Sequence, residues 1–144
     1  MKNLTKELIG IFSSETRCKI LEMLGEGYDH PDDLAEELGL TRQAVDKHLI
    51  ELHEWGIVER NAVFQHQGRP KIIYELTKPG KKLMNTLDNL AERYKKTLLD
   101  RAEEEIKQLD MKLAMGEISE KIYRKKLREL KERWSYSELK GGDE

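Results

Sequence analysis

The sequence is short of cysteine, proline and long apolar runs, and each shortage narrows what the chain can be. Its single cysteine, Cys18, cannot form an internal disulfide, and its apolar neighbours favour a small buried hydrophobe over a redox switch. Only three prolines accompany 38% hydrophobic and 38% charged residues, a composition that suits a helix-rich protein with much solvated surface. No apolar run approaches the roughly 20 residues of a membrane span, and the N-terminus lacks the pattern of a signal peptide. We therefore expect a cytoplasmic protein that makes no membrane contact.

The chain also lacks the residue clusters of common active sites and metal sites. It contains no glycine-rich phosphate loop, no paired-carboxylate cleft, and no serine or cysteine beside a histidine and an acid. Of its four histidines, His48 and His53 would lie about 140° apart on a helix, too far around to share a metal ion, and His30 and His66 are isolated. The sequence therefore predicts no catalytic residue, no metal and no cofactor.

Charge is nearly balanced overall but unevenly distributed. The formal net charge is -2, so the chain as a whole has no electrostatic attraction for nucleic acid. Residues 22–59 contain eleven acidic and two basic residues, whereas residues 60–82 contain six basic and one acidic residue. Any contact with DNA must therefore use a local basic surface, and this second segment is the place to find it.

The first half of the chain has the spacing of short amphipathic helices. Pro31 is well placed in the first turn of one helix, and Gly39 is a typical C-terminal cap for it. Thr41 then provides the N-cap of a further helix. The apolar face of that helix consists of Val45, Leu49 and Leu52. Two short helices joined by so tight a turn are typical of a helix-turn-helix.

Two β-rich stretches follow, and beyond them the pattern is helical. "WGIVERNAVFQ" and "KIIYELT", separated by "HQGRP", predict a hairpin with a projecting turn. Proline-free leucine spacing then predicts a helix of roughly 30 residues that Gly116 ends, and Ser119 caps another helix. We predict a mainly α protein with a small β-hairpin (α+β). Its parts are a winged helix-turn-helix at 1–82, a long helix and antiparallel helical hairpin at 83–140, and a frayed tail at 141–144.

The second helix of the helix-turn-helix carries side chains suited to reading base edges. In this motif that helix lies in the major groove and its N-terminal residues meet the bases. Arg42 suits guanine and Gln43 suits adenine, while small side chains suit phosphate or a thymine methyl. The predicted DNA contacts of the helix are Thr41, Arg42, Gln43, Ala44, Lys47 and His48. The alternative is an ordinary amphipathic helix, since any such helix exposes arginine, glutamine and lysine.

The predicted hairpin adds basic side chains to this surface. Its turn contains Arg69, which suits a narrow minor groove because the electrostatic potential there is strongly negative. The predicted DNA contacts of the hairpin are Arg60, Gln67, Arg69 and Lys71. The acidic helix at 32–38 opposes them, so we expect binding without sequence preference to be weak and salt-sensitive. Neither the reading helix nor the hairpin should bind DNA well alone.

Residues 8–82 resemble the ArsR-type winged helix-turn-helix regulators. The stretch "LAEELGLTRQAVDKHLIELHEWGIVE" carries most of this resemblance, with "GRPKIIYELTKPGKKL" after it. The resemblance implies a homodimeric transcription regulator of double-stranded DNA, with a recognition helix at 41–53 and a wing at 57–76. Repression is the family default. Metal-sensing members carry cysteine pairs or acidic and histidine clusters that this sequence lacks, so a metal sensor of that type is not expected.

The C-terminal part offers apolar stripes for association. The predicted dimerisation residues are Leu83, Leu87, Leu90, Tyr94, Leu98, Ile106 and Leu109. The alternative is a monomeric hairpin that packs on its own domain. "LDMKLAMGEISEKIYRKKLRELKE" resembles the short C-terminal helical module known as SHOCT, which implies oligomerisation or a protein partner. A second hypothesis for the whole chain is a winged-helix protein-interaction module in a transcription assembly, with the acidic helix at 32–38 as its contact surface.

Overall fold

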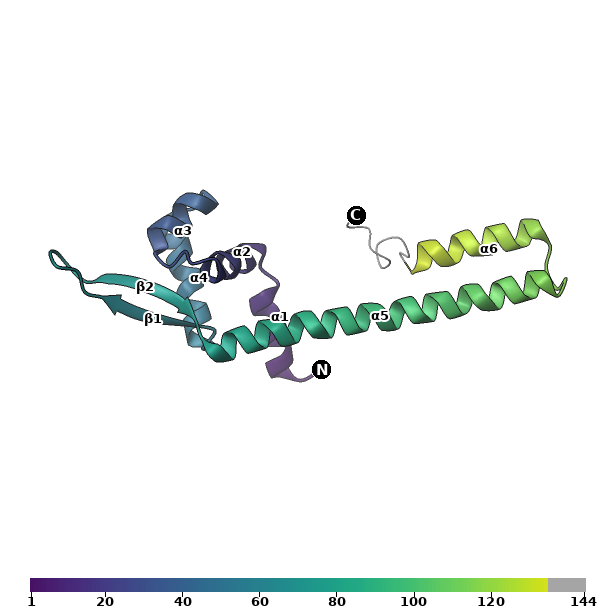
Figure 1. Cartoon of the computed structure of the whole chain (residues 1–144), viewed down its shortest axis with the longest axis horizontal. Helices are drawn as coiled ribbons and strands as arrows, with labels where there is room; N and C mark the ends of the chain where they lie inside the picture. Colours follow the sequence, from purple (N-terminus) through teal and green to yellow (C-terminus); the bar gives the residue numbers. More distant parts are fainter. Residues whose placement is uncertain (135–144) are drawn as a thin grey trace. The chain divides into compact units, whose positions relative to one another are not determined.

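The computed structural model describes residues 1–134, which contain six helices and a two-stranded hairpin (Figure 1). In chain order these are α1 (Asn3–Phe12), α2 (Glu15–Gly25), α3 (Pro31–Leu38), α4 (Arg42–Glu54), β1 (Val58–Val63), β2 (Lys71–Leu76), α5 (Lys78–Ala114) and α6 (Glu120–Arg133). They form two compact units, Met1–Asn85 and Thr86–Glu144, and α5 contributes to both. The predicted fold class is confirmed, while the predicted frayed tail at 141–144 lies outside the described residues.

The helices begin where short polar side chains cap them. The Ser14 hydroxyl accepts a hydrogen bond from the Arg17 amide at 3.2 Å, which starts α2. The Thr41 hydroxyl accepts one from the Ala44 amide at 3.1 Å, which starts α4. Gly39 ends α3 with a φ of 65°, a conformation that costs glycine little. The turn of the helix-turn-helix therefore rests on caps that the sequence predicted.

The hairpin leaves the first unit as a projecting wing. β1 and β2 pair antiparallel, from Val58 opposite Leu76 to Val63 opposite Lys71. Val58 is buried, whereas every residue from 59 to 70 is exposed. Figure 1 shows the hairpin extending beyond the helices of this unit. The wing is therefore anchored at one end only, and its turn is open to solvent.

The core of the first unit fixes the orientation of α4. Val45, Leu49 and Leu52 have 0% of their surface exposed, so one face of α4 is completely enclosed by the core. Leu83 and Met84, from the start of α5, pack against the same core. Because α4 buries this face, its opposite face is the one presented to solvent.

The end of α5 pairs with α6 in an antiparallel helical hairpin (Figure 1). Trp134 donates its indole N–H to Glu105 at 2.7 Å, and the Tyr123 hydroxyl donates to Asp110 at 2.5 Å, which raises the pKa of Tyr123. The later residue of the α6 segment, Trp134, thus meets the earlier residue of α5, Glu105, which shows that the two helices run antiparallel. On α6 the Ile122 side chain is 46% exposed, whereas Tyr123 is half-buried and contacts α5 through Asp110.

Gly80 allows α5 to start directly against the end of the helix-turn-helix. A Cβ at this position would overlap the carbonyl oxygen of Ile57, which is rigid backbone. We expect Gly80→Ala to lower the free energy of unfolding by about 1–3 kcal/mol, as overpacking does. Denaturant titration followed by circular dichroism measures this. Gly10→Ala, where the added methyl meets open space in a helix, is the control and should be neutral or stabilising by up to about 1 kcal/mol. Equal stability of the two variants would contradict the packing described.

Candidate nucleic-acid interface

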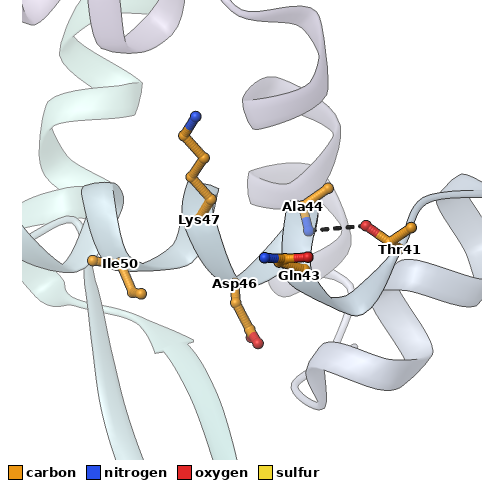
Figure 2. A pocket seen from close by; sticks show the side chains of 6 residues that line it. All are labelled: Thr41, Gln43, Ala44, Asp46, Lys47 and Ile50. Carbon is orange, nitrogen blue, oxygen red and sulfur yellow. Dashed lines mark hydrogen bonds between the residues drawn. The ribbon is translucent and has the colours of Figure 1, made fainter.

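The solvent-facing side of α4 carries a row of polar and apolar side chains. Gln43, Lys47 and Ile50 are exposed and follow one another at spacings of four and three residues, so they share a stripe. Together with Thr41, Ala44 and Asp46 they line an open hollow (Figure 2). In this view Lys47 and Asp46 point to opposite sides of the helix. The stripe lies opposite the buried face of α4 and is the part of the helix that a ligand could reach.

Arg42, predicted to read guanine, is held by two carboxylates. Its Nη1 donates to Asp32 of α3 at 2.8 Å, and its Nε donates to Asp46, one turn along α4, at 3.1 Å. The hydrogen bond from Arg42 lowers the pKa of Asp32, and the one to Asp32 raises the pKa of Arg42. A base contact by Arg42 therefore has to compete with at least one of these pairs.

His48, predicted to contact phosphate, lies half-buried against α2. Its Nδ1 accepts a hydrogen bond from Nε of Arg17 at 3.3 Å, and burial lowers the pKa of His48, with the Arg17 charge adding to the effect. The same Arg17 donates from Nη2 to Glu51 at 2.5 Å and from Nη1 to the Gly10 carbonyl at 3.4 Å. His48 thus takes part in the contact between α2 and α4.

Arg17 was missed by the sequence analysis, although it joins three helices. Its contacts to Glu51, His48 and the last turn of α1 hold α4 against the first two helices. It is a positioning residue, because its side chain is only 16% exposed and faces the interior of the unit. No local pattern identifies it, since its partners on α4 lie more than 30 residues away in sequence.

The wing residues predicted to contact DNA are all accessible to some degree. Arg60 lies on β1 opposite Tyr74, and Gln67 and Arg69 lie in the exposed turn. Lys71, at the start of β2, is half-buried. The structure also reveals Phe64, which is 81% exposed directly after β1 and was not singled out from the sequence. The wing tip therefore offers positive charge together with one large aromatic ring.

The predicted dimerisation stripe divides into three parts. Leu83 packs against the core of the first unit, and Leu109 is buried to 6% exposure in the second. Leu90 and Tyr94 are 55% and 64% exposed, so they form an open apolar segment on α5. Residues of intermediate exposure are Leu87, Leu98 and Ile106. Within the described chain, only Leu90 and Tyr94 in the middle of the stripe are more than half exposed.

Residues 1–134 lack two other kinds of site. No group of three or more histidine, cysteine, aspartate or glutamate side chains in this part of the chain could hold a metal ion. None of the helices of this part has the length and apolarity needed to cross a membrane.

The winged helix-turn-helix is shared with known regulators. Residues 14–60 match the family model described as "Bacterial regulatory protein, arsR family", so this segment is similar to the helix-turn-helix of that family. No curated protein matches the sequence. The match ends at residue 60, and the resemblance of the C-terminal helices to the SHOCT module stays a prediction.

Solved structures support the same fold. The chain is similar to diamide-treated YodB from B. subtilis, with a TM-score of 0.55 and 21% identity over 63% of this chain and 89% of that one. It is also similar to a MarR-family protein from Enterococcus faecalis V583, with a TM-score of 0.53 and 20% identity over 72% and 94%. YodB is a transcriptional regulator, and the Enterococcus faecalis protein is described as a transcriptional regulator of the MarR family. The family match and the fold support a DNA-binding transcription regulator.

The environment of His48 predicts a pH dependence of stability. In the unfolded chain its pKa returns to the ordinary value of 6.5, above the lowered folded-state value. Below pH 6.5 the unfolded chain therefore binds more protons, and the stability that neutral His48 contributes is lost as the pH falls through this window. We expect wild-type protein to lose more stability between pH 7.5 and 5.5 than His48→Asn, whose amide oxygen still accepts from Arg17 but does not titrate. Denaturant titrations at both pH values test this, and equal losses would contradict it.

Proposed function

We propose that this chain is a homodimeric, sequence-specific DNA-binding transcriptional repressor that reads a pseudo-palindromic operator. The recognition helix is residues 41–53 and the wing is residues 57–76. The observation that carries the proposal is the exposed stripe of α4, where Gln43 and Lys47 face solvent directly opposite a fully buried apolar face. A helix held in this way presents a fixed row of side chains to the major groove.

Base reading falls first to Gln43. Its side-chain NH2 group can donate to N7 of adenine while its carbonyl oxygen accepts from the N6 amino group, which is the bidentate pattern that glutamine is suited to make. Lys47, one turn later, supplies a phosphate contact that adds affinity without sequence information. The remaining helix contacts in the proposal are Thr41, Ala44, Arg42 and His48. Arg42 and His48 take a smaller share, because carboxylates engage the first and the Arg17 contact engages the second.

The wing supplies the positive charge that the helices lack. Four exposed carboxylates on α3 lie in the same unit as the recognition helix and repel phosphate. Arg69 in the exposed turn, with Arg60, Gln67 and Lys71 on the strands and turn, offsets this repulsion at the flanking backbone or minor groove. The helix gives sequence preference and the wing gives much of the affinity, so each depends on the other.

The homodimer is supported by apolar surface that the described chain does not cover. Leu90 and Tyr94 on α5 are more than half exposed, and so are Leu4 and Ile9 on α1. We propose that residues 83–140 serve mainly for association, with 1–82 as the DNA-binding domain.

A two-fold dimer presents two recognition helices, which fit half-sites about one helical turn apart. Occupying such a site blocks polymerase, which is the proposed means of repression.

One observation favours a second candidate function, a protein-interaction module in a transcription assembly. Asp32 and Asp46 neutralise Arg42, so part of the recognition helix is already satisfied without DNA. In this alternative the acidic α3 is the contact surface. Failure of the wild-type protein to bind any duplex from a random pool at moderate salt would favour it.

Two substitutions on the recognition helix should have different effects on DNA binding, one on sequence preference and the other on overall affinity. Gln43→Ala should cost about 1–3 kcal/mol for each half-site of the preferred duplex and relax preference at one base pair of each half-site. Lys47→Gln should weaken binding to all duplexes alike and lower the slope of log K against log salt by about 1.8, because a dimer loses two phosphate contacts. Fluorescence anisotropy on duplexes enriched from a random pool, over a salt series, measures both effects.

Gln108→Ala in the second unit is the matched control, because Gln108 is exposed and its amide contacts only Glu104 within the described residues. It should leave both quantities unchanged. If the pool yields no enriched sequence, or if Gln43→Ala binds the preferred duplex as tightly as wild type, the proposed use of α4 is wrong.

A further inference from the structure

Ile50 is an apolar side chain in an unexpected place. It is 54% exposed, although its neighbours Leu49 and Leu52 on α4 have 0% exposure. It lies in the exposed stripe after Gln43 and Lys47 and lines the same hollow (Figure 2). Isolated exposed apolar residues are common on protein surfaces. This one, however, lies on the face that the proposed function assigns to the major groove.

The spacing along α4 suits contact with more than one base pair. Gln43 and Ile50 are seven residues apart, which is about 10.5 Å along a helix axis. Base pairs rise about 3.4 Å each, so a recognition helix that follows the groove would place these two side chains roughly three base pairs apart. Residues over two turns of one helix read bases in this way in homeodomains. Ile50 is therefore within the reading length of the helix.

The chemistry of the major groove offers an isoleucine one favourable partner. Every base edge there presents hydrogen-bond donors or acceptors, and thymine alone adds an apolar group, its C5-methyl. The β-branched side chain of Ile50 is stiff at χ1, so little rotamer freedom remains to be lost on contact. We propose that Ile50 is a specificity-determining residue that selects thymine through its methyl group, about three base pairs from the adenine read by Gln43. This inference rests on the proposed function.

The charges around Ile50 favour DNA over an apolar protein partner. Lys47 is exposed one turn away and has no ion-pair partner within residues 1–134. Asp46 is paired with Arg42 and points to the other side of the helix, and the acidic residue that shares the stripe is Glu54, exposed one turn beyond Ile50. From Gln43 to Ile50 the stripe therefore combines a positive charge with a small apolar contact, which suits a phosphate and a thymine methyl side by side.

Removing a single methyl group from the DNA tests the inference without changing any hydrogen bond. The probe is the duplex that full-length wild-type protein enriches from a random pool, with each thymine replaced in turn by deoxyuridine. Replacing the contacted thymine in one half-site should weaken wild-type binding about fourfold, the effect of one buried carbon, and replacing it in both half-sites should weaken binding about fifteenfold. Ile50→Ala should bind the unmodified duplex more weakly by a similar factor and lose no further affinity at that replacement. Ile50→Val should keep part of the discrimination.

Ile122→Ala is the matched control, because Ile122 is also about half exposed but lies on α6. It should discriminate thymine from deoxyuridine as wild type does. If wild type binds an enriched duplex but no deoxyuridine weakens it, or if Ile50→Ala still discriminates, the role of Ile50 is wrong while the proposed function stands. If no sequence is enriched, the proposed function fails and this inference fails with it. Thermal melts of the variants check folding, which an exposed position should leave intact.

Discussion

The burial of one face of α4 determines what the rest of the molecule can do. Val45, Leu49 and Leu52 are fully enclosed, and truncating a leucine in such a position costs about 2–5 kcal/mol, so the helix is not free to rotate. Arg17 adds a polar restraint by joining α4 to α1 and α2. With its inner face fixed, the helix presents one row of side chains to solvent, and its capacity to recognise a ligand depends on that row.

Electrostatics then limits how strongly this row can bind a polyanion. The helix-turn-helix is acidic, and its most obvious guanine reader, Arg42, is held by Asp32 and Asp46. Positive charge comes instead from the wing, which is attached to the unit at one end only and has an exposed turn. A chain with a net charge of -2 can bind DNA through such a division of roles, in which the helix selects and the wing attracts.

Local chemistry made most of the fold predictable. Thr41 and Gly39 bound the turn because capping and a positive φ depend on only a few neighbouring residues. Contacts between distant segments were not predictable: Arg17 with His48 and Glu51, and Arg42 with Asp32, depend on how the helices pack. These contacts alter the predicted site most, because they engage two of its six helix residues. The contact of Tyr123 with Asp110 has the same origin, since only packing against α5 fixes which side of α6 faces it.

Dimethyl sulfate interference on an enriched duplex tests the central claim most directly, because methylation marks guanine N7 in the major groove and adenine N3 in the minor groove. The account predicts two clusters of interfering guanines 10–10.5 base pairs apart, one for each recognition helix of a dimer, with interfering adenines beside each cluster where the wing lies. On a bound duplex with guanines in both half-sites, interference confined to the minor groove, or none at all, would contradict the proposed use of α4.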